Sequence, residues 1–249
     1  MYHKLKTKAF FPHPIALAFA VVSMQAAGQE EGPPTLEEIL VTAQKRVESL
    51  QEVPISVSAV TGDKLNNSGV ENLEDLTALM PNIHFNQSGF STQVRVRGIG
   101  SDNSQGFEQS VGMYIDDIYY GRAQLFRTPM MDMERAELLR GPQSTLFGKN
   151  TVAGALNLST ARPTSDFTGR LSASYSEEFG EQEVNGMLSG PVTEELRARL
   201  AVRDYHNDGY MYNTTLRRQE PVTDESAARL SLEYLPTDQL SFFLKEVGS

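Results

Sequence analysis

The sequence predicts a small α+β domain followed by antiparallel β-strands of an incomplete transmembrane β-barrel. Three observations support this fold class: an N-terminal segment typical of exported proteins, a mixture of short helical and strand patterns over residues 47–163, and five segments of alternating polarity after Pro163. No later segment approaches the roughly 20 continuous apolar residues that a membrane-spanning helix needs. A location within a membrane would therefore require a barrel.

Residues 1–28 have the pattern of a secretory signal peptide. Lysines precede the apolar run Ile15–Val22, and the small residues Ala26 and Gly28 stand where they are expected before cleavage at Gln29. An N-terminal membrane anchor is the alternative. An apolar run of this length is too short to cross about 30 Å of hydrocarbon as a helix, so the pattern favours export.

The overall composition excludes several classes of protein. With 39% hydrophobic and 22% charged residues, the chain is too apolar for general disorder. Its formal net charge of −10 argues against a nucleic-acid partner, because nucleic-acid binders carry basic surfaces. The absence of cysteine excludes disulfides and thiolate metal sites.

Residues 29–46 are expected to form an extended leader that holds one short strand-prone segment. In the stretch "EEILVTAQKR", the β-type apolar residues Ile39–Val41 lead into Thr42 and Ala43. A strand at this place has no obvious partner within the leader. It is either the first strand of the following domain or a segment kept free to pair with another protein.

The expected α+β domain, residues 47–163, begins with a strand over Val53–Ala59, in which apolar and polar side chains alternate. The sequence "TGD" then marks a turn. The segment "ENLEDLTALMPN" predicts a short helix, with Asn72 as its N-cap and Asp75 three residues later. Pro81 ends this helix, because the residue before a proline disfavours helical geometry.

Further strands are expected in the segments "TQVRVRGIG", "VGMYIDDIYYGR" and "AGALNLSTARP". The second segment contains two strands joined at Asp116 and Asp117. Adjacent strand residues point to opposite faces, so this pair of carboxylates is poorly placed for acid–base catalysis and suits a turn. Pro163 ends the last of these strands.

The five segments after Pro163 alternate between apolar and polar residues over roughly ten positions each, which is typical of transmembrane β-strands. Arginine recurs on the polar face, as in Arg199 and Arg229. A soluble β-sandwich shares the period of two and is the alternative. The segments begin near Phe167, Glu183, Leu196, Ala228 and Leu240.

Two glycine-containing segments approach nucleotide-binding motifs but break them. "GPQSTLFGKNT" has Gln143 where a phosphate-binding loop needs its first glycine, and Asn150 where it needs serine or threonine. "GIGSDNSQG" has Asn103 at the third glycine position of a dinucleotide fingerprint. The chain is therefore predicted not to be an enzyme and to need no cofactor. No metal site is expected either, because metal-binding spacing is missing among the histidines His3, His13, His84 and His206.

The order of these pieces closely resembles that of the TonB-dependent outer-membrane receptors of the siderophore-receptor type. The resemblance runs from about residue 37 to the end, and its most specific part is "LRGPQSTLFGKNTVAGALN". It implies that residues 47–163 are a plug domain inside a barrel, and that residues 164–249 are the first strands of that barrel. Five strands cannot close such a barrel, so the chain is expected to be an N-terminal fragment.

By the same resemblance, the strand-prone segment of the leader is the Ton box, which pairs with the energy-coupling protein TonB. It would stay free so that it can add a strand to a sheet of its partner, with backbone hydrogen bonds supplying much of the affinity. A proline within it would remove a donor. The residues expected to bind TonB are Ile39, Leu40, Val41, Thr42 and Ala43.

The resemblance also implies roles for two sets of plug residues. One set lies in the most polar long loop of the domain and is the candidate for ligand contacts: Ser101, Asp102, Asn103, Ser104 and Gln105. The other set is expected to pack the plug core and to make polar contacts with the barrel wall: Arg140, Gly141, Pro142, Gly148 and Asn150.

The implied function is active import of a scarce nutrient, most often a ferric siderophore, across the outer membrane of a Gram-negative bacterium. Plug and leader would face the periplasm. The expected partners are TonB with its inner-membrane energising complex, outer-membrane lipid and the small-molecule cargo, and no nucleic acid. A passive porin or structural barrel, a soluble periplasmic enzyme and a truncated product without function are the alternatives.

Overall fold

A computed structural model describes the chain from residue 39 onward, with gaps. The expected signal peptide, the first part of the leader and Ala43 lie outside the described residues. Those described are residues 39–42, 45–46, 48–70, 72–88, 91–101, 108–122, 130–177, 179–237 and 240–248.

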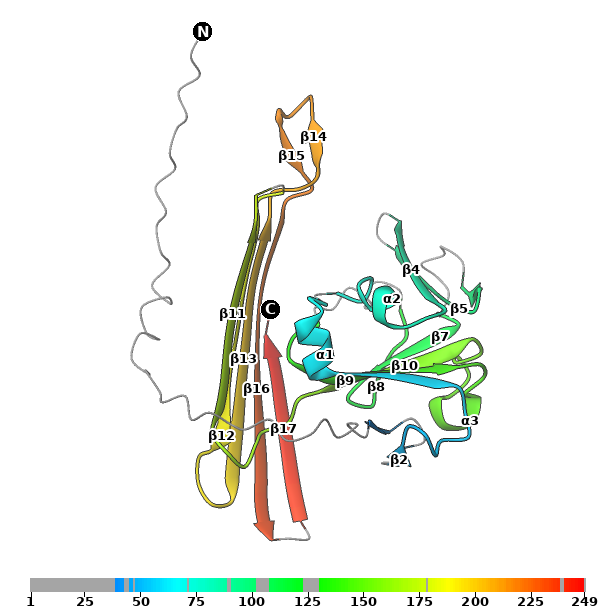
Figure 1. Cartoon of the computed structure of the whole chain (residues 1–249), viewed down its shortest axis with the longest axis vertical. Helices are drawn as coiled ribbons and strands as arrows, with labels where there is room; N and C mark the ends of the chain where they lie inside the picture. Colours follow the sequence, from blue (N-terminus) through cyan, green and yellow to red (C-terminus); the bar gives the residue numbers. More distant parts are fainter. Residues whose placement is uncertain are drawn as a thin grey trace, which may run out of the picture. The chain divides into compact units, whose positions relative to one another are not determined.

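A five-stranded mixed sheet, here called the central sheet, forms the framework of the first domain (Figure 1). In spatial order its strands are β3 (Val57–Thr61), β9 (Met133–Arg140), β10 (Gly154–Thr160), β7 (Val111–Ile115) and β8 (Ile118–Tyr120). Strands β10 and β7 run parallel, whereas the other neighbouring pairs are antiparallel. All of β7 and nearly all of β10 are buried, as expected for strands covered on both faces.

Two apolar clusters cover the two faces of the central sheet. Leu156 and Leu158 of β10 belong to the larger cluster, and Ala155, one position before Leu156, belongs to the smaller one. This division follows from the alternation of side chains along a strand. The smaller cluster also contains Val41 of the leader, which places the leader against this domain.

The turn between β7 and β8 consists of Asp116 and Asp117, which confirms the predicted hairpin. Both residues have positive φ, at 48° and 67°. A two-residue hairpin turn requires such angles, and aspartate tolerates them. The Asp116 carboxylate accepts hydrogen bonds from Thr160 N and Thr160 Oγ1, each at 2.8 Å.

Helix α1 (Gly62–Asn67) occupies the place where the sequence suggested only a turn. Thr61 precedes it and accepts a hydrogen bond from Lys64 N at 3.4 Å. A Cβ added at Gly62 would lie 2.1 Å from Met133 O, so only glycine lets the helix start this close to β9.

Helix α2 (Leu76–Leu79) is the predicted helix, but it is shorter than expected. Asp75, and not Asn72 as predicted, is the N-cap residue of this helix, and Asn72 instead caps the turn that precedes it. Asn72 Oδ1 accepts from Glu74 N at 2.8 Å and from Asp75 N at 3.2 Å, and Asn72 N donates to Asp75 Oδ2 at 3.1 Å. A third helix, α3 (Ser144–Phe147), lies in the segment that approached a phosphate-binding loop.

A small antiparallel sheet completes the first domain. Strand β4 (Ile83–Ser88) pairs with β5 (Ser91–Val96), and β5 pairs with β6 (Ile99–Gly100). The strand predicted in "TQVRVRGIG" is β5, and the predicted glycine-bearing loop after it is the turn at Arg97 and Gly98, whose φ angles are 53° and 80°. The hairpin of β4 and β5 has one apolar and one polar face.

The five alternating segments form one antiparallel sheet, here called the long-strand sheet, which confirms the prediction of consecutive amphipathic strands. Its strands are β11 (Thr168–Ser176), β12 (Glu181–Pro191), β13 (Leu196–Asn207), β16 (Thr223–Thr237) and β17 (Leu240–Gly248). The sequence did not predict the hairpin of β14 (Met211–Asn213) and β15 (Arg218–Glu220), which extends from the ends of β13 and β16 (Figure 1).

The long-strand sheet has the opposite polarity to a soluble sheet. Leu171 and Leu244 are 69% and 65% exposed, whereas Arg199, Arg203 and Arg229 are buried. An apolar outer face and a polar inner face are what strands of a membrane barrel require. Among the described residues, no helix is long and apolar enough to cross a membrane.

Candidate functional site

The leader forms a short strand that pairs back on the chain. Strand β1 (Leu40–Val41) lies antiparallel to β2 (Glu48–Ser49), and Leu50 N donates to Ile39 O at 2.9 Å. The segment that was expected to stay unpaired is therefore paired in this structure. The physical reason is that a nearby piece of the same chain, four residues beyond a turn at Lys45, can satisfy its backbone at little entropic cost.

Val41 is the apolar anchor of this strand. It is only 1% exposed and packs with Tyr114, Leu139 and Phe147 in the smaller apolar cluster. Its neighbour Leu40 points outward and is 47% exposed. One face of the leader strand is thus fully seated on the first domain, which sequence periodicity over two residues could not reveal.

Polar contacts hold the residues that follow Val41. Thr42 N donates to Glu137 Oε1 at 2.7 Å, and Lys45 N donates to Thr42 O at 2.8 Å. The Lys45 ammonium pairs with Asp117 and lies 5.0 Å from the centre of the Phe147 ring. A cation over an aromatic face is attracted to it, so Lys45 fixes the turn after the leader strand.

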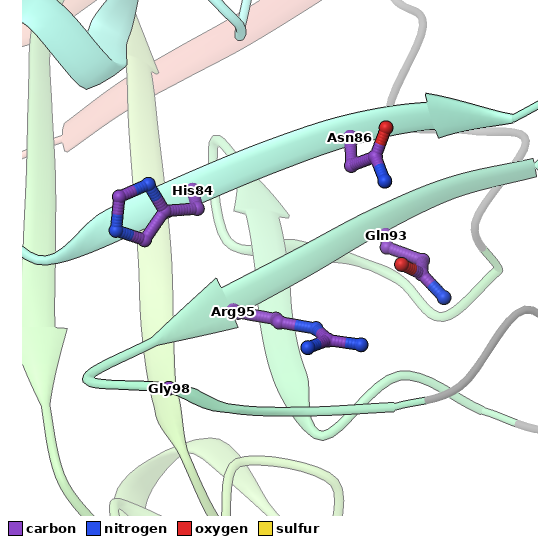
Figure 2. A pocket seen from close by; sticks show the side chains of 5 residues that line it. All are labelled: His84, Asn86, Gln93, Arg95 and Gly98. Carbon is purple, nitrogen blue, oxygen red and sulfur yellow. The ribbon is translucent and has the colours of Figure 1, made fainter.

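A polar cavity of about 380 Å³ lies on the hairpin of β4 and β5 (Figure 2). The strand register sets His84 opposite Arg95 and Asn86 opposite Gln93, so these four side chains share one face. Gly98, in the turn after β5, completes the lining. The opposite face carries the apolar residues of the hairpin: Ile83, Phe85, Val94 and Val96.

The lining of this cavity suits an oxygen-rich anion. Arg95 is its one formally charged residue, and no carboxylate is among the lining residues. Guanidinium, imidazole and amide groups all donate hydrogen bonds, and arginine binds planar oxygen anions with two parallel bonds. The sequence offered only a weak signal for this site, namely polar residues at alternate positions on two adjacent strands.

Of the five predicted ligand-contact residues, only Ser101 lies within the described part of the chain. Ser101 Oγ lies 2.7 Å from Ser110 Oγ, accepts from Ser110 N at 2.6 Å and donates to Glu108 O at 3.2 Å. These bonds join the two ends of the loop. Asp102, Asn103, Ser104 and Gln105 lie outside the described residues.

The described contacts of Arg140 lie within the first domain. Its guanidinium donates to Ser58 and, at 3.3 Å, to Pro81 O at the start of the β4–β5 hairpin. Burial lowers the pKa of Arg140, and nearby Arg97 lowers it further. Arg140 therefore connects the end of β9 to the base of the hairpin that carries the cavity.

The rest of this predicted structural set consists of turn residues. Gly141 and Gly148 have φ angles of 87° and 81°, with Pro142 between them in the chain. Asn150 donates to Tyr119 OH at 2.9 Å and also to Glu108. Among the described residues, none of these contacts reaches the long-strand sheet, so the expected contact of this set with the barrel wall stays a prediction.

Several aspartates of the first domain make ion pairs to the long-strand sheet. Arg199 donates to both oxygens of Asp132, at 2.8 and 2.5 Å, and Arg229 donates to the same carboxylate at 3.2 Å. Lys245 pairs with Asp116. The sequence showed these arginines as a polar face but gave no sign of their partners.

A further pair, Arg170 with Asp63 at 2.8 Å, joins the same two parts at the surface. Within the part of the chain that the structure describes, no three histidine, aspartate or glutamate side chains gather closely enough to hold a metal ion.

Together, these features define a class of protein. Its members combine a folded domain, which carries a leader strand, with a membrane-barrel sheet whose polar inner face makes ion pairs to that domain. Residues 49–155 match the family described as TonB-dependent Receptor Plug Domain. The match falls on the central sheet, its helices and the hairpin that carries the cavity.

Named proteins with similar sequences point the same way. The iron-regulated outer membrane virulence protein of Vibrio cholerae is 25% identical over 94% of this chain and 36% of its own length. The pesticin receptor of Yersinia enterocolitica is 29% identical over 88% of this chain and 32% of its own length. The present chain thus spans about a third of the length of these curated relatives.

A solved structure shares the fold. The crystal structure of the ferric yersiniabactin uptake receptor FyuA from Yersinia pestis superposes with a TM-score of 0.68 at 26% identity, over 74% of this chain and 29% of that one. Residues 49–155 thus carry the plug domain of TonB-dependent receptors, and the chain is similar to outer-membrane receptors of this kind both in that domain and in the antiparallel strands that follow it.

Proposed function

We propose that this protein imports a ferric siderophore across the outer membrane by active transport driven through TonB. The observation that carries the proposal is the leader strand seated on the plug. A short extended segment at the expected Ton box position is held by backbone pairing with β2, by the buried side chain of Val41 and by the bond from Thr42 N to Glu137. A partner's sheet can replace the backbone pairing, because strand addition uses the same backbone donors and acceptors.

Two observations support iron as the cargo. Two of the relatives are named for iron regulation and for uptake of a ferric siderophore. The cavity on the β4–β5 hairpin offers hydrogen-bond donors and one guanidinium, Arg95, and no carboxylate. Ferric chelates with anionic oxygen donors fit such a lining better than apolar or cationic solutes do.

The proposed mechanism has three steps. Cargo binds to the plug and to the barrel, the leader strand leaves its seat and pairs with TonB, and the force applied through TonB rearranges the plug. No bond in the cargo is made or broken. In this mechanism the protein binds the cargo selectively at the plug and barrel, and its leader strand can be released to pair with TonB.

A proline substitution in the leader tests this function. Val41→Pro removes one backbone donor and fixes φ, which is unfavourable for strand pairing, while Val41→Ala keeps the donor and serves as the control. We expect Val41→Pro to abolish uptake of radioactive ferric siderophore with little change in its binding to cells. Val41→Ala should retain uptake.

Uptake that continues in Val41→Pro, or that is unaffected by collapse of the proton-motive force, would contradict the proposal and favour a passive porin. A screen with ferric siderophores, cobalamin and haem as competing cargos decides the cargo separately. Competition by cobalamin alone would overturn the assignment of iron while leaving TonB-dependent import in place.

A further inference from the structure

The central sheet contains a fully buried carboxylate. Glu137, in the middle of β9, is 0% exposed. A charge in such a place is tolerated only when hydrogen bonds and an opposite charge surround it. Two partners come from the sheet itself: Arg135 Nε donates to Glu137 at 2.9 Å, and Asn157 Nδ2 donates at 3.2 Å.

The remaining partners of Glu137 come from the leader. Thr42 N donates at 2.7 Å, and Thr42 Oγ1 lies 3.2 and 3.3 Å from the two carboxylate oxygens. Arg135 and Asn157 also donate to Thr42 Oγ1, each at 3.4 Å. Both the amide and the hydroxyl of Thr42 are therefore engaged by one cluster of three side chains.

This cluster binds the residue next to the buried Val41. The leader is thus held by an apolar contact at Val41 and by a charge-assisted contact at Thr42. Hydrogen bonds to a charged group are roughly twice as strong as those between neutral groups. When the leader leaves, Glu137 loses its strongest neutral donor, so the carboxylate opposes release.

We propose that Glu137, positioned by Arg135 and Asn157, is the latch that keeps the leader strand on the plug. The latch and a partner's strand compete for the leader, because Thr42 N and the face of Val41 are already used in the seated state. The biological meaning of the latch, namely control of access for TonB, rests on the proposed function. The latch itself is a property of the plug.

The absence of cysteine makes a direct test possible. Val41→Cys places a single thiol at a position that is closed when the leader is seated. The protein is expressed from its natural reading frame into the outer membrane, and the rate of labelling by a water-soluble maleimide is measured in isolated membranes without TonB or cargo. Labelling then reports only how often the leader leaves its seat.

Glu137→Gln in the Val41→Cys background removes the charge while keeping the shape of the side chain. We expect labelling to become roughly tenfold faster or more, as the loss of a hydrogen bond to a charged group implies. Glu134→Gln is the matched control. It removes a carboxylate from the same strand that also pairs with Arg135, at 2.7 Å, but Glu134 is not among the partners of Thr42.

Equal labelling rates in Glu137→Gln and in the control would overturn the latch. General unfolding of the plug is recognised with a second reporter, Ala153→Cys, which is 2% exposed in the larger apolar cluster. If Glu137→Gln also opens this position, Glu137 is a fold-stabilising residue and the latch is rejected. Failure of the import tests above would leave these labelling results unchanged, so the two proposals fail separately.

Discussion

Tyr114 shows how one side chain links the core to the leader. It is 7% exposed, its ring lies 5.0 Å from that of Phe147 in an edge-on arrangement, and its hydroxyl donates to Phe147 O. The same ring lines the seat of Val41. A substitution here therefore affects both the stability of the plug and the holding of the leader.

The ionisation of Tyr114 predicts a loss of stability in alkali. Burial raises its pKa above the usual value of 10.0, and Tyr119 raises it further. The folded plug thus binds this proton more tightly than the unfolded chain does. The corresponding contribution to stability is complete below about pH 10 and is lost as the pH rises through the folded-state pKa.

Tyr114→Phe tests this expectation. At neutral pH the variant should cost about 1 kcal/mol, because Phe147 O loses its donor. Above pH 10 the variant should lose less stability than the wild type does. Pulse proteolysis across a urea series at pH 8 and pH 11 measures both effects, and an identical alkaline loss in the two proteins would contradict the assignment.

At the scale of the element, the β4–β5 hairpin packs into the core with one face and lines the cavity with the other, because side chains alternate along each strand. One face packs into the larger apolar cluster, and the other carries His84, Asn86, Gln93 and Arg95 toward the cavity (Figure 2). Because the register pairs these residues across the strands, a change at one of them alters the cavity without disturbing the apolar face.

Arg95 is predicted to dominate anion binding in the cavity. Arg95→Glu should weaken binding of an anionic ferric chelate at least about tenfold, since it replaces an attraction by a repulsion. The affinity of Arg95→Lys should lie between those of the wild type and Arg95→Glu, because lysine keeps the positive charge but lacks the planar guanidinium group. Lys64→Glu, the same change of charge on α1, is the control. Equilibrium binding to membranes is the measurement, and equal affinity in Arg95→Glu and the control would disprove the role.

The turn before α2 gives a prediction about stability alone. Asn72 and Asp75 cap each other's backbone amides. Asn72→Ala should therefore destabilise the plug by about 1 kcal/mol, the usual cost of losing a hydrogen bond to the backbone. Asn67→Ala, at the exposed end of α1, should change stability by less. Urea midpoints from pulse proteolysis compare the two, and an unchanged midpoint in Asn72→Ala would show that the cap is not needed.

At the scale of the whole molecule, charge pairs join the plug to the long-strand sheet. The pairs differ in burial. Asp132, Arg199 and Arg229 have side chains that are 12%, 9% and 6% exposed, whereas Asp63 and Arg170 are 77% and 49% exposed. Buried pairs are costly to break because one charge is left without a partner, and exposed pairs contribute little.

Asp132→Asn is therefore predicted to loosen the plug far more than Asp63→Asn does. The first change should cost about 3 to 5 kcal/mol, and the second less than about 1 kcal/mol. Hydrogen exchange of the β9 amides at neutral pH measures the local stability beside Asp132. Equal protection in the two variants would show that the buried pair does not anchor the plug.

The sequence by itself determined the features that depend on neighbours in the chain. Alternation fixed the faces of the long strands, adjacent aspartates fixed the β7–β8 turn, and Asn72 marked the start of a helical turn. Each of these follows from residues at most three positions apart, because side-chain direction and capping are local properties.

Only the tertiary structure decided how distant residues meet. Thr42 binds a carboxylate 95 residues away, and Asp132 meets arginines 67 and 97 residues further on. Sequence patterns therefore could not predict where the leader binds on the plug, or which residues pair with Arg199 and Arg229. The physical reason is that a buried charge needs a hydrogen-bonding partner, and tertiary packing decides which distant residue supplies it. Local sequence periodicity carries no information about that choice.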